Sequence, residues 1–249
     1  MNKHIVSILL TLVLLISLTG CTQNDGSSYI TKDQQKIGEE QQTTNQGTLL
    51  IEGFEGGTIQ SVLDTGLGFH VANQERVEFV RSPTRSGTYA LKLTVKPEDI
   101  AEKKNRAEIR YNIPKDIEEK SEMWYSWSFM IPSDFVDHPE ESKAFNVIAQ
   151  WLDLPTQQEE DSNRGPPISF NYGTINGQSG ISVIYGLKGA DVKKGDRSVG
   201  QVYIKKGEWI DVSVHMKRSQ ENDGFIEVWI NGNSITQGKV YGPNIYNAE

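Results

Sequence analysis

Short segments in which apolar and polar residues alternate run from about residue 48 to the end of the chain, separated by residues that favour turns. Alternation with a period of two residues is typical of strands that bury one face of a sheet. The clearest cases are Trp209–Lys217 and Phe225–Ile230, and Asn231-Gly232 after the second favours a two-residue hairpin turn. About ten such segments, with no helical pattern longer than about two turns, predict an all-β fold, a two-sheet β-sandwich or jelly roll.

The first 20 residues have a different pattern. Lys3 precedes an apolar run from Ile5 to Leu18, which is too short to span a membrane as a helix and is typical of a signal peptide. The run ends at Gly20-Cys21, which resembles the bacterial lipoprotein signal, in which cleavage leaves a lipidated cysteine as the first residue. Lipid chains such as palmitate on Cys21 would anchor the protein to the outer face of a bacterial membrane. An ordinary secretory signal that happens to contain a cysteine is the alternative.

Residues 21–47 are rich in Gln, Thr, Gly and charged residues. They contain too few apolar side chains to offset the entropy cost of folding. We therefore expect a flexible tether between the anchor and a single domain, residues 48–249, and an ordered strand extension is the alternative.

The amino-acid composition excludes several classes of binding partner and cofactor. The chain has 33 acidic and 25 basic residues and a net charge of −8, which disfavours binding to nucleic acid. Its single cysteine excludes a disulfide framework and a cysteine-ligated zinc site. We expect no cofactor and a monomer. A structural Ca²⁺ held by Glu52, Glu55 or Asp211 stays open, although no acidic spacing matches a known calcium loop.

A row of charged residues lies on one predicted strand. By alternation, Arg106, Glu108 and Arg110 share one face, and Ala107 and Ile109 share the other. Such a row cannot be core without partners. It is either a salt-bridge ladder on a solvated sheet face or a binding site for charged groups.

Several segments in a fixed order resemble the heparin lyase I-like and glucuronan lyase-like polysaccharide lyases. The resemblance runs from about Leu50 to the last residue, and its segments are 52–55, 87–95, 106–114, 124–135, 147–155, 166–173, 207–219 and 224–233. It implies a concanavalin A-like jelly roll that cleaves an acidic polysaccharide, rich in uronic acid, by β-elimination across a concave sheet. In this chemistry the uronate carboxylate is neutralised, a base removes the weakly acidic C5 proton, and an acid protonates the departing 4-oxygen.

The resemblance also implies roles for individual residues. Arg106 and Gln150 match positions that bind and neutralise the carboxylate, and Arg110 and Glu108 extend the same row. Arginine suits this role because its guanidinium pairs with a carboxylate through two hydrogen bonds. For Gln150, which shares a predicted face with Ile148 and Leu152, a hydrogen bond to loop backbone is the alternative.

Two departures from the family pattern affect the catalytic residues. In the family, Gln-Trp is usually followed by His, but here Leu152 follows Trp151 and cannot transfer a proton. The family also usually ends with a strand that carries a catalytic Tyr and Lys. One alignment leaves this strand out of the chain, and the other makes Tyr241 and Tyr246 its tyrosines, with Tyr246 as the acid or base.

Three further residues are candidates for substrate binding. His70 would line the cleft or lie in a loop, and Tyr172 and Tyr185 would stack on sugars, deliver a proton or pack in the core. The sequence therefore favours a surface-anchored polysaccharide lyase, with a non-catalytic carbohydrate-binding protein as the alternative. A glycoside hydrolase would need two carboxylates that project from one strand, and no such pattern occurs.

Overall fold

The computed structural model describes residues 6–11, 17–18, 49–101, 105–114, 122–137, 145–152, 165–187 and 197–246. Of the first two ranges and of Phe145 it describes the backbone alone. The described chain is mostly β, with antiparallel strands in several sheets, which confirms the β-rich prediction. Its helices are one turn of α-helix, α1 (Ile59–Leu63), and a 3-10 turn, η1 (Gln74–Arg76). In this part of the chain no helix has the length and apolar character needed to cross a membrane.

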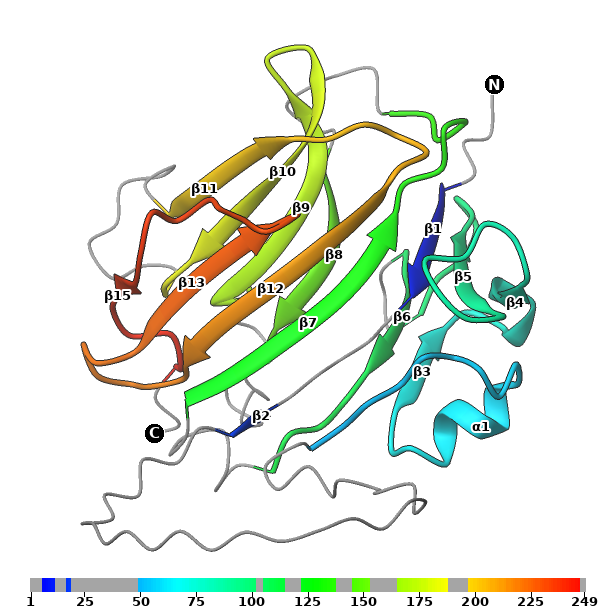
Figure 1. Ribbon diagram of the computed structural model, residues 1–249, viewed down its shortest axis with the longest axis horizontal. Helices are drawn as coiled ribbons and strands as arrows, with labels where there is room; N and C mark the ends of the chain where they lie inside the picture. Colours follow the sequence, from blue (N-terminus) through cyan, green and yellow to red (C-terminus); the bar gives the residue numbers. More distant parts are fainter. Residues whose placement is uncertain are drawn as a thin grey trace, which may run out of the picture.

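The largest sheet has nine strands. Its path is β14 (Asn233–Ser234), β13 (Phe225–Ile230), β12 (Trp209–Lys217), β7 (Glu122–Met130), β1 (Val6–Thr11), β5 (Ala90–Val95) and β4 (Val77–Val80). Two short strands lie off this path: β15 (Val240–Tyr241) pairs with β13, and β2 (Ser17–Leu18) pairs with β7. In Figure 1 the long strands β12 and β7 lie in front of β8, β9 and β10.

Part of the predicted signal segment lies in this sheet. The backbone of β1 pairs with β5 on one side and with β7 on the other, both antiparallel. An apolar segment that contains β-branched residues, as VSILLT does, can form a strand as readily as a signal core. Cleavage after Gly20 stays a prediction, and Cys21 and the tether up to residue 47 lie outside the described residues.

The other strands form two smaller sheets. The four-stranded sheet has the order β11 (Ser198–Tyr203), β10 (Gln178–Tyr185), β9 (Ile168–Ile175) and β8 (Phe145–Trp151). The two-stranded sheet pairs β3 (Gly68–Val71) with β6 (Ala107–Arg110). A tight turn at Asn176-Gly177, with φ of 50° and 78°, joins β9 to β10, as its residue types favour.

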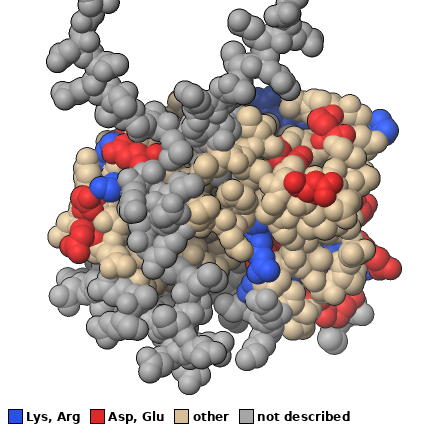
Figure 2. All heavy atoms as spheres, turned by 90° about the horizontal axis from the view of Figure 1, so that it is seen from below, with Lys and Arg blue, Asp and Glu red and all other residues tan. Residues whose placement is uncertain are grey.

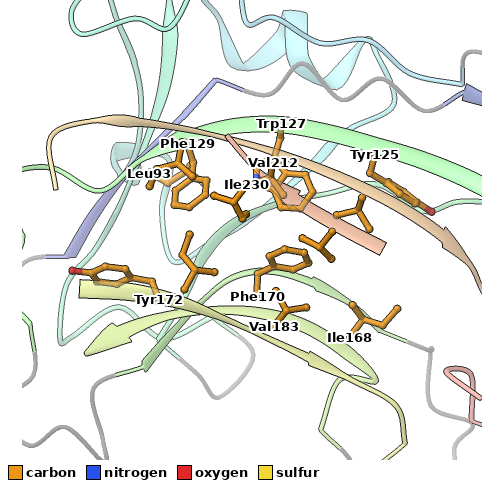
Figure 3. Close-up of a cluster of buried hydrophobic side chains, with 14 of the residues drawn as sticks. Leu93, Tyr125, Trp127, Phe129, Ile168, Phe170, Tyr172, Val183, Val212 and Ile230 are labelled. Carbon is orange, nitrogen blue, oxygen red and sulfur yellow. The ribbon is translucent and has the colours of Figure 1, made fainter. Parts of the chain in front are cut away.

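The core lies between the nine-stranded sheet and the smaller ones. Tyr125, Trp127 and Phe129 of β7 face Phe170 and Tyr172 of β9 (Figure 3). The rings of Trp127 and Phe170 meet edge to face with centroids 5.2 Å apart, a favoured geometry for aromatic pairs. The two-stranded sheet covers the same core through four partly buried side chains, those of Phe69, Val71, Ala107 and Ile109.

Alternation predicted the faces of β12 correctly. Ile210, Val212, Val214 and Met216 are buried in the core, and the residues between them point away from it. His215 belongs to that outer face yet is buried, because the ring of Trp124 stacks on it with centroids 4.4 Å apart.

On β8 the prediction of faces was wrong at one position. The register with β9 shifts between Val147 and Ala149, so a β-bulge interrupts the alternation. Ile148 therefore packs against the core instead of sharing a face with Gln150. Val147, which pairs with Asn171, is 41% exposed.

Candidate functional site

The candidate site lies on the outer face of β3, β6 and β8. Ala107 and Ile109 turn toward the core, so Glu108 and Arg110 point the other way, as the sequence predicts. In the antiparallel pair, His70 lies directly opposite Glu108, which brings the two side chains together on this face.

The carboxylate of Glu108 lies at the centre of the cluster. Its Oε1 accepts a hydrogen bond from Nη1 of Arg106 at 2.9 Å and lies 3.2 Å from Nδ1 of His70. Nη1 of Arg106 also lies 3.3 Å from Nδ1 of His70. All three side chains are partly buried, with exposed fractions of 33% for Glu108, 19% for Arg106 and 14% for His70. Partial burial strengthens these interactions relative to an exposed surface pair.

Gln150 joins the cluster from another sheet. Its Nε2 donates to Oε2 of Glu108 at 3.5 Å, a long hydrogen bond. The bulge sets this direction, because Gln150 pairs with Ser169 on the outer face while Trp151 turns inward against Tyr125 and Phe170. The structure thus brings together Arg106 and Gln150, which sequence reasoning had predicted as a pair.

Arg110 has a different environment on the same face. It is exposed and lies opposite Gly68, where an added Cβ would touch Cγ and Nε of Arg110 at 3.6 and 3.7 Å. Among the described residues, no carboxylate lies within ion-pair distance of Arg110. Its charge is therefore available to an anionic ligand, whereas that of Arg106 is already balanced by Glu108.

The structure does not place Tyr172 with this cluster. Its side chain is fully buried, and its hydroxyl donates to Asp137 at 2.7 Å and lies 3.3 Å from the hydroxyl of Ser179. Burial raises the pKa of Tyr172 far above its usual range. It therefore holds the loop at Asp137 to β9 and does not reach the outer face.

Tyr185 is also a core residue. Its hydroxyl donates to the carbonyl of Gly242 at 2.7 Å and accepts from the side-chain amide of Asn244 at 2.9 Å. Burial raises the pKa of Tyr185 to about 12. These bonds fasten the C-terminal segment to β10, so Tyr185 is not available to a ligand on the outer face.

Tyr246 and Leu152 lie near the ends of the strands that border the site. The hydroxyl of Tyr246 donates to the carbonyl of Gly165, just before β9, at 3.3 Å. Leu152, the residue after β8, is 53% exposed. Leu152 has no group that can transfer a proton, and the contact of Tyr246 with Gly165 is not a contact with the cluster.

Each of the three acidic residues considered for calcium has a structural contact within the protein. Glu55 accepts from the backbone N–H of Thr88, which lowers the pKa of Glu55. Asp211 pairs with Arg85 through two hydrogen bonds of 3.0 and 2.8 Å, which lower the pKa of Asp211. Glu52 is buried and accepts from the N–H of Phe54. Within the described ranges, no three His, Cys, Asp or Glu side chains are grouped to hold a metal ion.

Charge is dispersed over the surface seen from below the view of Figure 1. On the described part of that face, Lys and Arg occur in small groups among acidic and uncharged residues (Figure 2). An anionic ligand would therefore be recognised by local pairing more than by a broad positive field.

Comparison with known proteins adds one finding. A family model described as polysaccharide lyase matches residues 31–247, which is most of the chain and includes every strand from β3 to β15. Searches of the curated proteins and of the solved structures found no match.

Proposed function

Because this chain belongs to the polysaccharide lyase family, we propose that it cleaves a uronic-acid-containing polysaccharide by β-elimination on the outer face of β3, β6 and β8. One observation supports this site above all: His70 on β3, Gln150 on β8 and Arg106, the residue before β6, converge within hydrogen-bonding distance of the Glu108 carboxylate. A guanidinium and an amide can neutralise the sugar carboxylate, and an imidazole can serve as the base.

The reaction has two demands that these residues can meet. Hydrogen bonds from Arg110, Arg106 and the amide of Gln150 to the sugar carboxylate would stabilise the negative charge that develops when the C5 proton leaves. His70 would accept that proton. The electron pair of the C5–H bond then forms the C4–C5 double bond while the bond from C4 to the glycosidic oxygen breaks. That oxygen takes a proton from an acid.

The acid is proposed from the family resemblance. Tyr246 is the candidate on this chain. Without an acid, the site would bind an acidic glycan and not cleave it, which is the second candidate function.

The place of action is part of the proposal. A signal segment that ends at Gly20-Cys21 would deliver the domain to the outer face of a bacterial membrane, with lipid on Cys21 as the anchor. Labelling cells with a palmitate analogue should mark the wild-type protein and leave Cys21→Ser unmarked. A labelled Cys21→Ser protein would contradict the anchor.

Activity is tested directly by ultraviolet absorbance. Elimination creates a double bond conjugated to the carboxylate, whereas hydrolysis and binding do not. The purified protein should increase this absorbance with at least one of heparin, glucuronan and alginate. Binding to one of these polymers without an increase in absorbance would identify the non-catalytic function. If the protein neither bound these polymers nor increased the absorbance, both the lyase function and the binding function would be contradicted.

A further inference from the structure

We infer that Glu108 is the positioning residue of this site, and that its carboxylate, instead of binding the sugar, holds His70, Arg106 and Gln150 in one arrangement. The inference rests on the proposed function and adds to it a role for a residue that the sequence suggested as a substrate ligand. The hydrogen bonds of the Glu108 side chain support it.

Both oxygens of Glu108 are engaged by the protein. Oε1 is within hydrogen-bonding distance of Arg106, next to β6, and of His70 on β3. Oε2 is within hydrogen-bonding distance of Gln150 on the four-stranded sheet. In the described chain no backbone ladder joins β6 to β8. Glu108 therefore links the two sides of the site through its side chain.

A carboxylate at this position is a poor ligand for a sugar acid. Like charges at close range repel each other, and the repulsion grows as the site is shielded from water. Glu108 also balances the charge of Arg106, which leaves Arg110 as the cation on this face without a carboxylate partner in the described chain. The sugar carboxylate is accordingly expected to approach Arg110, together with the N–H groups of Gln150 and Arg106 that Glu108 does not occupy.

The contact with His70 has a chemical consequence. Nη1 of Arg106 carries two hydrogens and lies nearer to Oε1 of Glu108, at 2.9 Å, than to Nδ1 of His70, at 3.3 Å, so the carboxylate is its nearer acceptor. Oε1 also lies 3.2 Å from Nδ1 of His70, and because an ionised carboxylate only accepts, we assign the ring proton to Nδ1. In the neutral ring this tautomer leaves the lone pair on Nε2, and a fixed lone pair is what a base requires.

Two variants of Glu108 test the inference by kinetics. Glu108→Gln keeps the shape and removes the charge, so kcat should fall by about a hundredfold while KM changes by less than about threefold. Glu108→Asp should restore part of kcat. The matched control is Glu78→Gln, which removes an ion pair with Lys92 at 2.9 Å on the nine-stranded sheet and should change neither constant. A Glu108→Gln enzyme with raised KM and normal kcat would overturn the inference.

A second measurement does not depend on activity. The nitrogen NMR signals of the His70 ring should report a proton on Nδ1 in the wild type and an exchange-averaged tautomer in Glu108→Ala, with thermal melting to confirm that the variant is folded. A proton on Nε2 in the wild type, or unchanged signals in Glu108→Ala, would overturn the inference. Expected NMR signals without any lyase activity would contradict the proposed function and leave the role of Glu108 standing.

Discussion

His70 on β3 and Glu108 on β6 lie directly opposite each other, and Nδ1 of the imidazole is 3.2 Å from Oε1 of the carboxylate. The two residues are 38 positions apart in the chain, and only the pairing of their strands brings them together. Arg106 and Gln150 meet the same carboxylate, so one pair of facing residues organises the candidate site. Replacement of a residue in this site should change turnover, whereas replacement of a residue that holds the fold should change stability.

Gln150 and Trp151 are neighbours in the chain and should respond in opposite ways to replacement by alanine. Gln150→Ala removes a partly exposed amide, so turnover should be lost while thermal stability hardly changes. Trp151→Ala removes a ring packed against Tyr125, Trp127 and Phe170 and should cost about 3–5 kcal/mol of unfolding free energy. Chemical denaturation and the absorbance assay measure the two effects. Full turnover in Gln150→Ala would show that Gln150 does not take part in the reaction.

Arg110→Ala should weaken substrate binding. A hydrogen bond to a charged group contributes about 1.5–3 kcal/mol, so KM should rise by about 10- to 100-fold, and the difference from wild type should shrink as salt is added. Arg85→Ala is the matched control, because Arg85 is also a half-exposed arginine but pairs with Asp211 on the nine-stranded sheet. An equal KM for Arg110→Ala and wild type would show that this arginine does not meet the sugar.

Tyr172→Phe tests the assignment of this tyrosine to the core. The substitution removes a hydroxyl that donates to Asp137, whose other oxygen accepts from Lys206 at 2.6 Å. Loss of this bond should lower the unfolding free energy by about 1–3 kcal/mol. Turnover at a temperature where the variant is folded should stay at the wild-type level. A folded Tyr172→Phe variant without turnover would show that the Tyr172 hydroxyl is needed for catalysis.

Asp99 should contribute to stability in an acid-sensitive way. Its carboxylate accepts two hydrogen bonds from the guanidinium of Arg76, at 2.6 and 2.8 Å, and these lower the pKa of Asp99 in the folded protein. A group with a lowered folded pKa stabilises the protein above its unfolded pKa, 3.8 for Asp, and the contribution is lost as pH falls through the folded pKa. In urea titrations at pH 7, the unfolding free energy of the wild type should exceed that of Asp99→Asn, and the difference should become smaller below about pH 4. A difference in unfolding free energy that is constant with pH would contradict this account.

Much of the fold follows from local pattern. The faces of β12 and the shared face of Arg106, Glu108 and Arg110 were predictable, because side chains of a strand alternate whatever the strand packs against. The family resemblance, which the match over residues 31–247 supports, rested on the order of such segments. The position of Ile148 was not predictable, because a bulge depends on the register with the neighbouring strand.

By itself, the sequence of this protein indicated the long strands such as β7, β12 and β13, the apolar side of β12, and the charged groups that stand in one row. Only the tertiary structure decided that β3 pairs with β6, that β8 comes alongside, and that Tyr172 and Tyr185 turn into the core. The physical reason is the distance along the chain over which each property is set. Alternation is a property of neighbouring residues, whereas register and burial depend on contacts between segments that are far apart in the chain, and these form only when the sheets pack together.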